Sequence, residues 1–163
     1  MSSYQGKFAL DLAVYFEEAF TVLHDALAPR RPTSTHCDLR DRVTMLGPPP
    51  VSDTWWSLND PIARLQSEIQ AQLSDVALPF LEPLRGRHAF IQRWEEVGST
   101  ALHLNPRGDV VAGIVLKHLG YDARAKEVIE GAVSASVGTP THAFYRMIAN
   151  RYGYLNDGSA SNA

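Results

Sequence analysis

Residues 7–16 read KFALDLAVYF, a stretch in which apolar side chains recur at every second position. The side chains that would share one face of a strand are Phe8, Leu10, Leu12, Val14 and Phe16. A helix would spread the same side chains around its axis and leave no single face to bury. The stretch therefore predicts a β-strand that opens an N-terminal sheet.

Two more segments in the first third of the chain resemble strands. Polar and apolar residues alternate over residues 37–46, with Asp41 as the exception. The short segment 53–58 contains the adjacent tryptophans Trp55 and Trp56. We therefore expect a small sheet built from three segments of the first third.

The connections between these segments are less regular. Residues 17–28 fit either a connection or a short helix, because their apolar spacing is helical but prolines and arginines follow at once. The prolines within residues 47–50 are expected to end the second strand, since proline cannot donate to a strand ladder.

The spacing changes to three and four residues after Asn59. Asp60 and Pro61 are typical of a helix start, and the apolar residues that follow at helical spacing are Ile62, Leu65, Ile69, Leu73 and Val76. This pattern predicts an amphipathic helix that ends near Pro79.

Similar spacing, closed by glycines, predicts four further helices over residues 90–97, 111–119, 122–133 and 139–153. The third and fourth of the five helices are joined only by Gly120, Tyr121 and Asp122, so we expect them to form a helical hairpin. The fold class predicted is α+β: a small antiparallel sheet from the N-terminal third packed against an array of about five helices. We expect one domain over residues 1–155 and a flexible tail over 156–163.

Composition narrows the class of protein. The chain has 163 residues, a formal net charge of −3 and one cysteine, Cys37. A single cysteine cannot form an intramolecular disulfide, which favours a reducing compartment. The first residues lack the pattern of a signal peptide, and every apolar run is too short to cross a bilayer. We therefore expect a cytoplasmic protein with no membrane association and little affinity for nucleic acid.

Motifs that carry chemistry are absent. The histidines are not spaced like metal ligands, and neither the phosphate-binding patterns GxxxxGK and GxGxxG nor the nucleophile patterns GxSxG and SxxK occur. Cys37 beside His36 is interpreted as a buried thiol, because neighbours on a strand point to opposite faces. No metal, cofactor or catalytic residue is predicted.

The strongest candidate for a binding site combines charged and aromatic side chains. Asp38, Arg40 and Arg42 are two residues apart and would share one sheet face, near Trp55 and Trp56. Arginine and tryptophan are enriched at binding hot spots. The functional interpretation is a surface that binds an acidic or planar partner. The alternative is a cross-strand salt bridge beside a core tryptophan.

These residues also resemble a known family. The segments that carry the resemblance are Gly6, Lys7 and Phe8 leading to Leu12 and Tyr15, then Cys37, Asp38, Leu39, Arg40 and Arg42, then Trp55 and Trp56, and the helix end at 78–81. Over this first half, the chain resembles domain-of-unknown-function family 4304, a group of mainly bacterial proteins. The resemblance implies an α+β domain and supplies no activity, cofactor or catalytic residue.

One departure from that family bears on oligomeric state. Its members have a helix and a strand before the strand that here begins at Gly6. The sheet would then have an exposed edge, and an exposed edge invites pairing with another chain. We therefore expect a homodimer or a covering segment at this edge.

Three functional hypotheses follow. The first is a non-enzymatic protein-interaction module that uses the arginine and tryptophan surface. The second is a hydrolase or transferase whose site is assembled from dispersed residues such as His36, Asp38, Arg40 and His88. The third is a nucleic-acid-binding protein that uses the last helix, with Tyr145, Arg146, Asn150, Arg151 and Tyr152.

Overall fold

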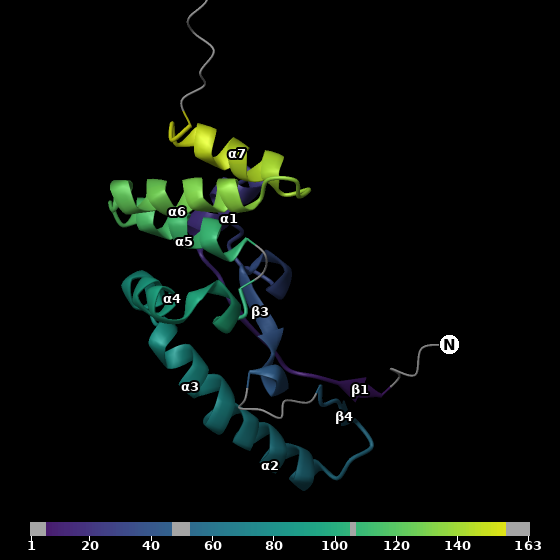
Figure 1. Cartoon of the computed structure of the whole chain (residues 1–163). Coiled ribbons are helices and arrows are strands. Elements are labelled where there is room, and N and C mark those ends of the chain that lie inside the picture. The colour runs from purple at the N-terminus through teal and green to yellow at the C-terminus, as the bar shows by residue number, and fades with distance from the viewer. Residues whose placement is uncertain (1–5, 47–52, 105–106, 156–163) are drawn as a thin grey trace, which may run out of the picture.

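The computed structural model describes residues 6–46, 53–104 and 107–155 (Figure 1). The strands are β1 (Lys7–Phe8), β2 (Asp11–Val14), β3 (Leu39–Arg42) and β4 (Trp56–Ser57). The main helices are α1 (Glu17–His24), α2 (Ile62–Gln72), α3 (Leu78–Leu81), α4 (Arg87–Ala101), α5 (Gly108–His118), α6 (Asp122–Ala135) and α7 (His142–Arg151). The predicted α+β class is confirmed. The prolines of 47–50 and the tail 156–163 lie outside the described residues.

The strands form two separate antiparallel ladders, β1 with β4 and β2 with β3. The prediction of one continuous strand over residues 7–16 is therefore wrong, because Ala9 and Leu10 lie between β1 and β2. The predicted strand over 37–46 is likewise reduced to β3. The physical reason is that the chain leaves β3 in the 3₁₀ turn Val43–Met45, so no partner runs along the whole of the first segment.

Helix α1 occupies the segment that the sequence left open. Ala19, Phe20 and Leu23 are buried on one side of it. Glu17 and Glu18 lie in its first turn, where negative charge complements the partial positive charge of a helix N-terminus. Of the two predicted alternatives for residues 17–28, the structure thus shows the short helix that the apolar spacing indicated.

The helical run that begins with α2 continues past Pro79, near which the sequence predicted its end. It passes through a π-helical turn (Leu73–Ala77) into α3 and then into the 3₁₀ turn Glu82–Leu84. Pro79 lies in the first turn of α3, directly after the wide turn, where a missing backbone N–H is tolerated. The helical run to Leu81 thus ends close to the predicted point, but the π-helical turn within it was not predicted, because such a turn leaves no signal in the apolar spacing.

The core is centred on α5, which packs against α1, α4 and α6. Only Asp109, Lys117 and His118 of α5 are outside the buried set. The predicted hairpin of α5 and α6 is confirmed, with Gly120 in the left-handed region at φ 84°. In Figure 1, α1, α5, α6 and α7 gather at one end of the molecule, and α2 lies with β1 and β4 at the other.

Candidate functional site

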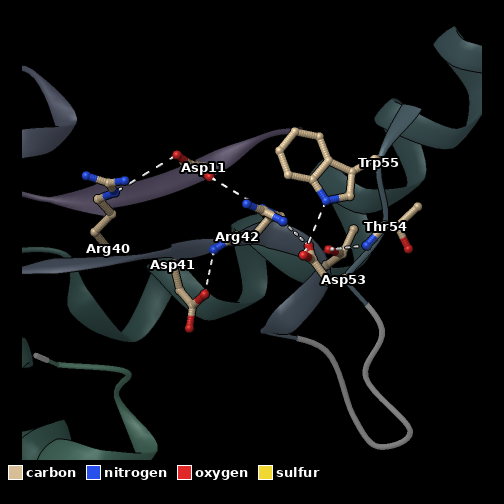
Figure 2. A network of polar contacts seen from close by, with 8 residues as sticks. Asp11, Arg40, Asp41, Arg42, Asp53, Thr54 and Trp55 are labelled. Atoms are coloured by element: carbon tan, nitrogen blue, oxygen red, sulfur yellow. Dashed lines mark hydrogen bonds and ion pairs between the residues drawn. The ribbon is translucent and has the colours of Figure 1, made fainter. Parts of the chain in front are cut away.

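The ladder of β2 and β3 places two arginines opposite an aspartate. Asp11 pairs with Arg42 and Ala13 pairs with Arg40, so both arginines lie on the same face of β3. The Nε atom of Arg40 is 4.0 Å from Asp11 Oδ2, and the Nε atom of Arg42 is 3.9 Å from Asp11 Oδ1 (Figure 2). Asp11 therefore lies between two guanidinium groups, but at distances too long for a direct hydrogen bond.

Arg42 is held by two further groups. It forms an ion pair and hydrogen bond with Asp53, and its guanidinium carbon is 4.3 Å from the ring centre of Trp55. Trp55 in turn donates its indole N–H to Asp53 Oδ2 at 3.2 Å (Figure 2). The hydrogen bond from Arg42 lowers the pKa of Asp53, so this carboxylate stays ionised. Arg42, Asp53 and Trp55 thus form a closed, charge-assisted unit.

Arg40 is in a different state. Its side chain is 49% exposed, and the ion pair at 4.0 Å to Asp11 is too long to be a hydrogen bond. In the part of the chain that the structure describes, its guanidinium donates no hydrogen bond. We call Arg40, Arg42 and Trp55 the Arg–Trp face. Its two arginines border a shallow hollow of about 330 Å³ that is also lined by Asp11, Asp41, Met45 and Asp53.

Asp38 does not join this face, contrary to the sequence prediction. It precedes β3, and its side chain is turned inward, with only 6% of the residue exposed. Burial raises the pKa of Asp38 to about 7, although the backbone N–H of Phe16 opposes the shift by a hydrogen bond. Two-residue alternation holds only within a strand, and here the ladder begins at Leu39.

Trp56 also lies away from the face, with 3% of its surface exposed. Its indole N–H donates to Glu68 Oε2 at 3.1 Å, and its ring centre is 5.7 Å from that of Phe8. For Trp56 the alternative interpretation, a core tryptophan, is therefore the correct one.

Two residues of the network were missed by sequence reasoning. Asp11 is one of the polar residues between the alternating apolar positions of residues 7–16, and only the strand register reveals that it meets the arginines. Asp53 lies next to Trp55 in sequence, and no spacing rule links it to Arg42. Asp41 also has a role: it accepts the backbone N–H of Arg42 and lies 2.7 Å from Nδ1 of His103.

Comparison with known families places this face in context. The family model described as Domain of unknown function (DUF4304) matches residues 1–83. The chain belongs to this family. The DUF4304 region, residues 1–83, includes both ladders, α2, α3 and the whole Arg–Trp face. No match to the chain was found among curated proteins or among solved structures.

The residues of the dispersed-site hypothesis lie in different surroundings. Arg40 lines the hollow of the DUF4304 region, whereas His88 lines another hollow with Tyr121. His36 accepts the backbone N–H of Thr33 through Nδ1. The structure thus does not bring these side chains to one point.

Cys37, interpreted as a buried thiol, is partly buried. Its thiol donates a hydrogen bond to the carbonyl of Thr33 at 3.4 Å. Burial raises the pKa of Cys37, which disfavours the reactive thiolate. A role as a nucleophile gains no support from this environment.

The last helix offers less surface than the sequence suggested. Tyr145 is buried, and Arg151 bonds to Asp25 at 2.9 Å and to the carbonyl of Val22 at 3.4 Å. Arg146, Asn150 and Arg151 are the exposed members of the predicted set, and Tyr152 is partly buried. Within residues 6–46, 53–104 and 107–155, no cluster of side chains suited to a metal ion occurs, and no helix has the length and apolar character needed to span a bilayer.

Proposed function

We propose that this protein is a non-enzymatic protein-interaction module that binds an acidic segment of a partner protein at the Arg–Trp face. The observation that carries the proposal is the state of Arg40: a half-exposed guanidinium without a hydrogen bond among the described residues, at the edge of a hollow. A guanidinium group presents a planar fork of donors that matches a carboxylate. Arg40 is thus available for a bidentate contact.

Two neighbouring residues support this role because their side chains are already held in place before a partner binds. Arg42 and Trp55 are held together through Asp53 and by stacking. A surface that is already ordered loses little conformational entropy when a partner binds. Arg42 and Trp55 would therefore act as a rigid border, and Arg40 would supply the new hydrogen bonds.

The carboxylates around the hollow set a condition on the partner. Asp11, Asp41 and Asp53 repel further negative charge, so an acidic side chain must approach Arg40 from its solvent side. Asp11 competes weakly for Arg40, because it is 4.0 Å away. We expect modest affinity that decreases as the salt concentration rises.

The test measures binding of labelled peptides by fluorescence anisotropy. A glutamate-rich peptide should bind saturably, and a lysine-rich peptide of equal length should not. Arg40→Ala should weaken binding at least tenfold, while Arg85→Ala, which removes an exposed arginine outside the face, should leave it unchanged. Unaltered affinity of the Arg40→Ala variant, or no binding of the acidic peptide, would contradict the proposal. Tighter binding of a single-stranded oligonucleotide would favour the nucleic-acid hypothesis instead.

A second copy of the chain is a further partner that we propose for the sheet edge. Among the described residues, no strand pairs with the outer edge of β2, whereas β3 has a bridge from Leu39 to Leu104 on its other side. The free edge of β2 could therefore pair with the same edge of a second copy. Analytical ultracentrifugation checks this: a strict monomer at high concentration would contradict it.

We also propose that the protein is cytoplasmic. Support comes from the single cysteine of the chain, Cys37, which cannot form an internal disulfide. Fractionation of cells that express a tagged chain would test this, and recovery from an extracellular or periplasmic fraction would contradict it.

A further inference from the structure

A hollow of about 450 Å³ lies apart from the Arg–Trp face, between α1, the start of α4, α5 and the end of α7. This volume is within the range of small-molecule sites. Its apolar wall includes Val22 and Ile114, and Tyr152 lines it as well. The remaining lining is mostly charged or polar, so the hollow combines an apolar wall with polar groups.

One charged pair at this hollow is already satisfied. Arg87 donates from Nε and Nη2 to the two oxygens of Glu18, at 2.7 and 2.9 Å. Burial alone would raise the pKa of Glu18, but the hydrogen bonds from Arg87 outweigh it and hold the pKa below its ordinary value. This pair is therefore a fixed, ionised part of the wall, and Lys117 is similarly engaged by Asp122.

Other polar groups at the hollow are unused. Within the described residues, the Nη1 atom of Arg87, the hydroxyl of Tyr152 and the carboxylate of Glu17 form no hydrogen bond. Burial raises the pKa of Tyr152 to about 12, so its hydroxyl keeps its proton and can donate. These three groups offer two donors and one carboxylate acceptor to a ligand, and the ring of His118 lines the hollow beside them.

The formal charge of the lining indicates what such a ligand carries. Apart from His118, the lining carries two carboxylates, Glu17 and Glu18, and two cations, Arg87 and Lys117, so their formal charges cancel. A net-neutral site with both unused donors and an unused carboxylate matches a ligand that carries both signs of charge. A simple anion would meet two carboxylates, and a simple cation would leave the two donors unused.

We propose that this hollow binds a free α-amino acid with an apolar side chain. Its ammonium group contacts Glu17, its carboxylate accepts hydrogen bonds from Arg87 Nη1 and the hydroxyl of Tyr152, and its side chain packs on Val22. The proposal is independent of the Arg–Trp face, with which this hollow shares no lining residue.

The experiment uses calorimetric titration of the full chain with three related compounds. L-Phenylalanine carries both charged groups, 3-phenylpropionate lacks the ammonium and 2-phenylethylamine lacks the carboxylate. Phenylalanine should bind saturably, and each truncated compound should bind at least tenfold more weakly. Absence of phenylalanine binding, or equal binding of either truncated compound, overturns the proposal.

Substitutions in the protein test which residue contacts the ammonium group of the ligand and which contacts its carboxylate. Glu17→Gln should weaken the binding of phenylalanine at least tenfold and leave the binding of phenylpropionate unchanged. Tyr152→Phe should weaken the binding of phenylalanine and leave the binding of phenylethylamine unchanged. Glu127→Gln and Tyr121→Phe are the matched controls, because both residues are exposed and lie outside the hollow. Circular dichroism checks that each variant is folded. A Glu17→Gln variant that binds phenylalanine like the wild type overturns the assignment.

Discussion

Helices α2 and α5 have the same length, 11 residues, and opposite environments. No residue of α2 is buried, whereas α5 is buried except at Asp109, Lys117 and His118. The reason lies in their sequences: α5 is apolar almost all round, and α2 has a narrow apolar stripe among glutamines and charged residues. Clear amphipathic spacing thus identified α2 as a helix without implying that it contributes to the core.

The exposed helix lies inside the region matched by the family model, and the buried helix lies outside it. Helix α2 lies in the DUF4304 region and α5 lies after it. Among the described residues, that region contributes only Phe16, Ala19, Leu23 and Leu39 to the buried main cluster. Phe20, Val43, Trp56 and Ala77 of this region are also buried, but they lie outside that cluster.

The largest expected effect comes from the same substitution in both helices. Ile114 is 1% exposed and Ile62 is 82% exposed. Ile114→Ala should lower the free energy of unfolding by about 2–5 kcal/mol, because it leaves a cavity in the core. Ile62→Ala should change it by less than about 0.5 kcal/mol. Urea denaturation measures both, and a comparable loss for Ile62→Ala would show that α2 is covered in solution.

A second large effect is expected where the two regions meet, at Asp38. Its pKa rises from 3.8 in the unfolded chain to about 7 in the folded protein, so between these values the folded protein binds more protons. The contribution of Asp38 to stability should therefore be greatest below about pH 4 and decrease as the pH rises through 7, by up to about 4 kcal/mol. Other carboxyl groups act in the opposite direction: the pKa values of Glu18 and Asp53 are lowered by folding, so their contribution to the stability of the protein is lost as the pH falls.

The contribution of Asp38 is isolated by comparing the wild type with Asp38→Asn. Denaturant unfolding between pH 4 and 8 should show the decrease in the wild type and not in this variant. Asp75→Asn is the control, because Asp75 is exposed. If Asp38→Asn kept the pH dependence of the wild type, Asp38 would not be its source.

A smaller effect tests how closely α5 and α6 approach. A Cβ atom at Gly113 would be 2.5 Å from Cγ1 of Ile129, whereas a Cβ atom at Gly131 would meet nothing within 4 Å. Gly113→Ala should destabilise by about 1–3 kcal/mol through overpacking. Gly131→Ala should stabilise by up to about 1 kcal/mol, because alanine favours the helix. Thermal unfolding distinguishes the two, and a stabilised Gly113→Ala variant would mean that the helices separate easily.

The sequence predicted the helices well because each has a local signal. Apolar spacing and the closing glycines fixed the predicted hairpin, and Gly98 does interrupt α4, with φ 78°. The π-helical turn after Gln72 was not predictable, since it is a change in hydrogen bonding that preserves the apolar stripe. Local patterns therefore sufficed wherever the structure depended on neighbours in sequence.

The candidate site depended on long-range pairing and was predicted only in part. Arg40 and Arg42 share a face as expected, because both lie inside β3. Asp38 left that face because the ladder begins one residue later, and no sequence pattern marks that boundary. The sequence also left open which tryptophan is buried, since both neighbours have the same side chain and Trp56 is distinguished only by its tertiary contacts with Phe8 and Glu68.

The smallest expected effect on stability comes from the hydrogen bond that joins α2 to Trp56 of β4. Both tryptophans donate an indole N–H to a carboxylate, Trp56 to Glu68 of α2 and Trp55 to Asp53. Trp56→Phe keeps an aromatic ring beside Phe8 but removes the donor. Because Trp56 is buried, the loss of this hydrogen bond should cost about 1 kcal/mol. Trp55→Phe should cost less, since Trp55 is 37% exposed and water can replace its contact.

Hydrogen exchange locates this effect within the molecule. In the Trp56→Phe variant, amides of α2 should exchange faster while those of α5 keep the wild-type rate, because α2 opens without the main core. Glu68→Gln should raise exchange in α2 as well, and adding it to Trp56→Phe should have little further effect if the two residues act through one hydrogen bond. Equal acceleration in α5 would contradict the contrast between the two helices, because it would mean that they unfold as a single unit.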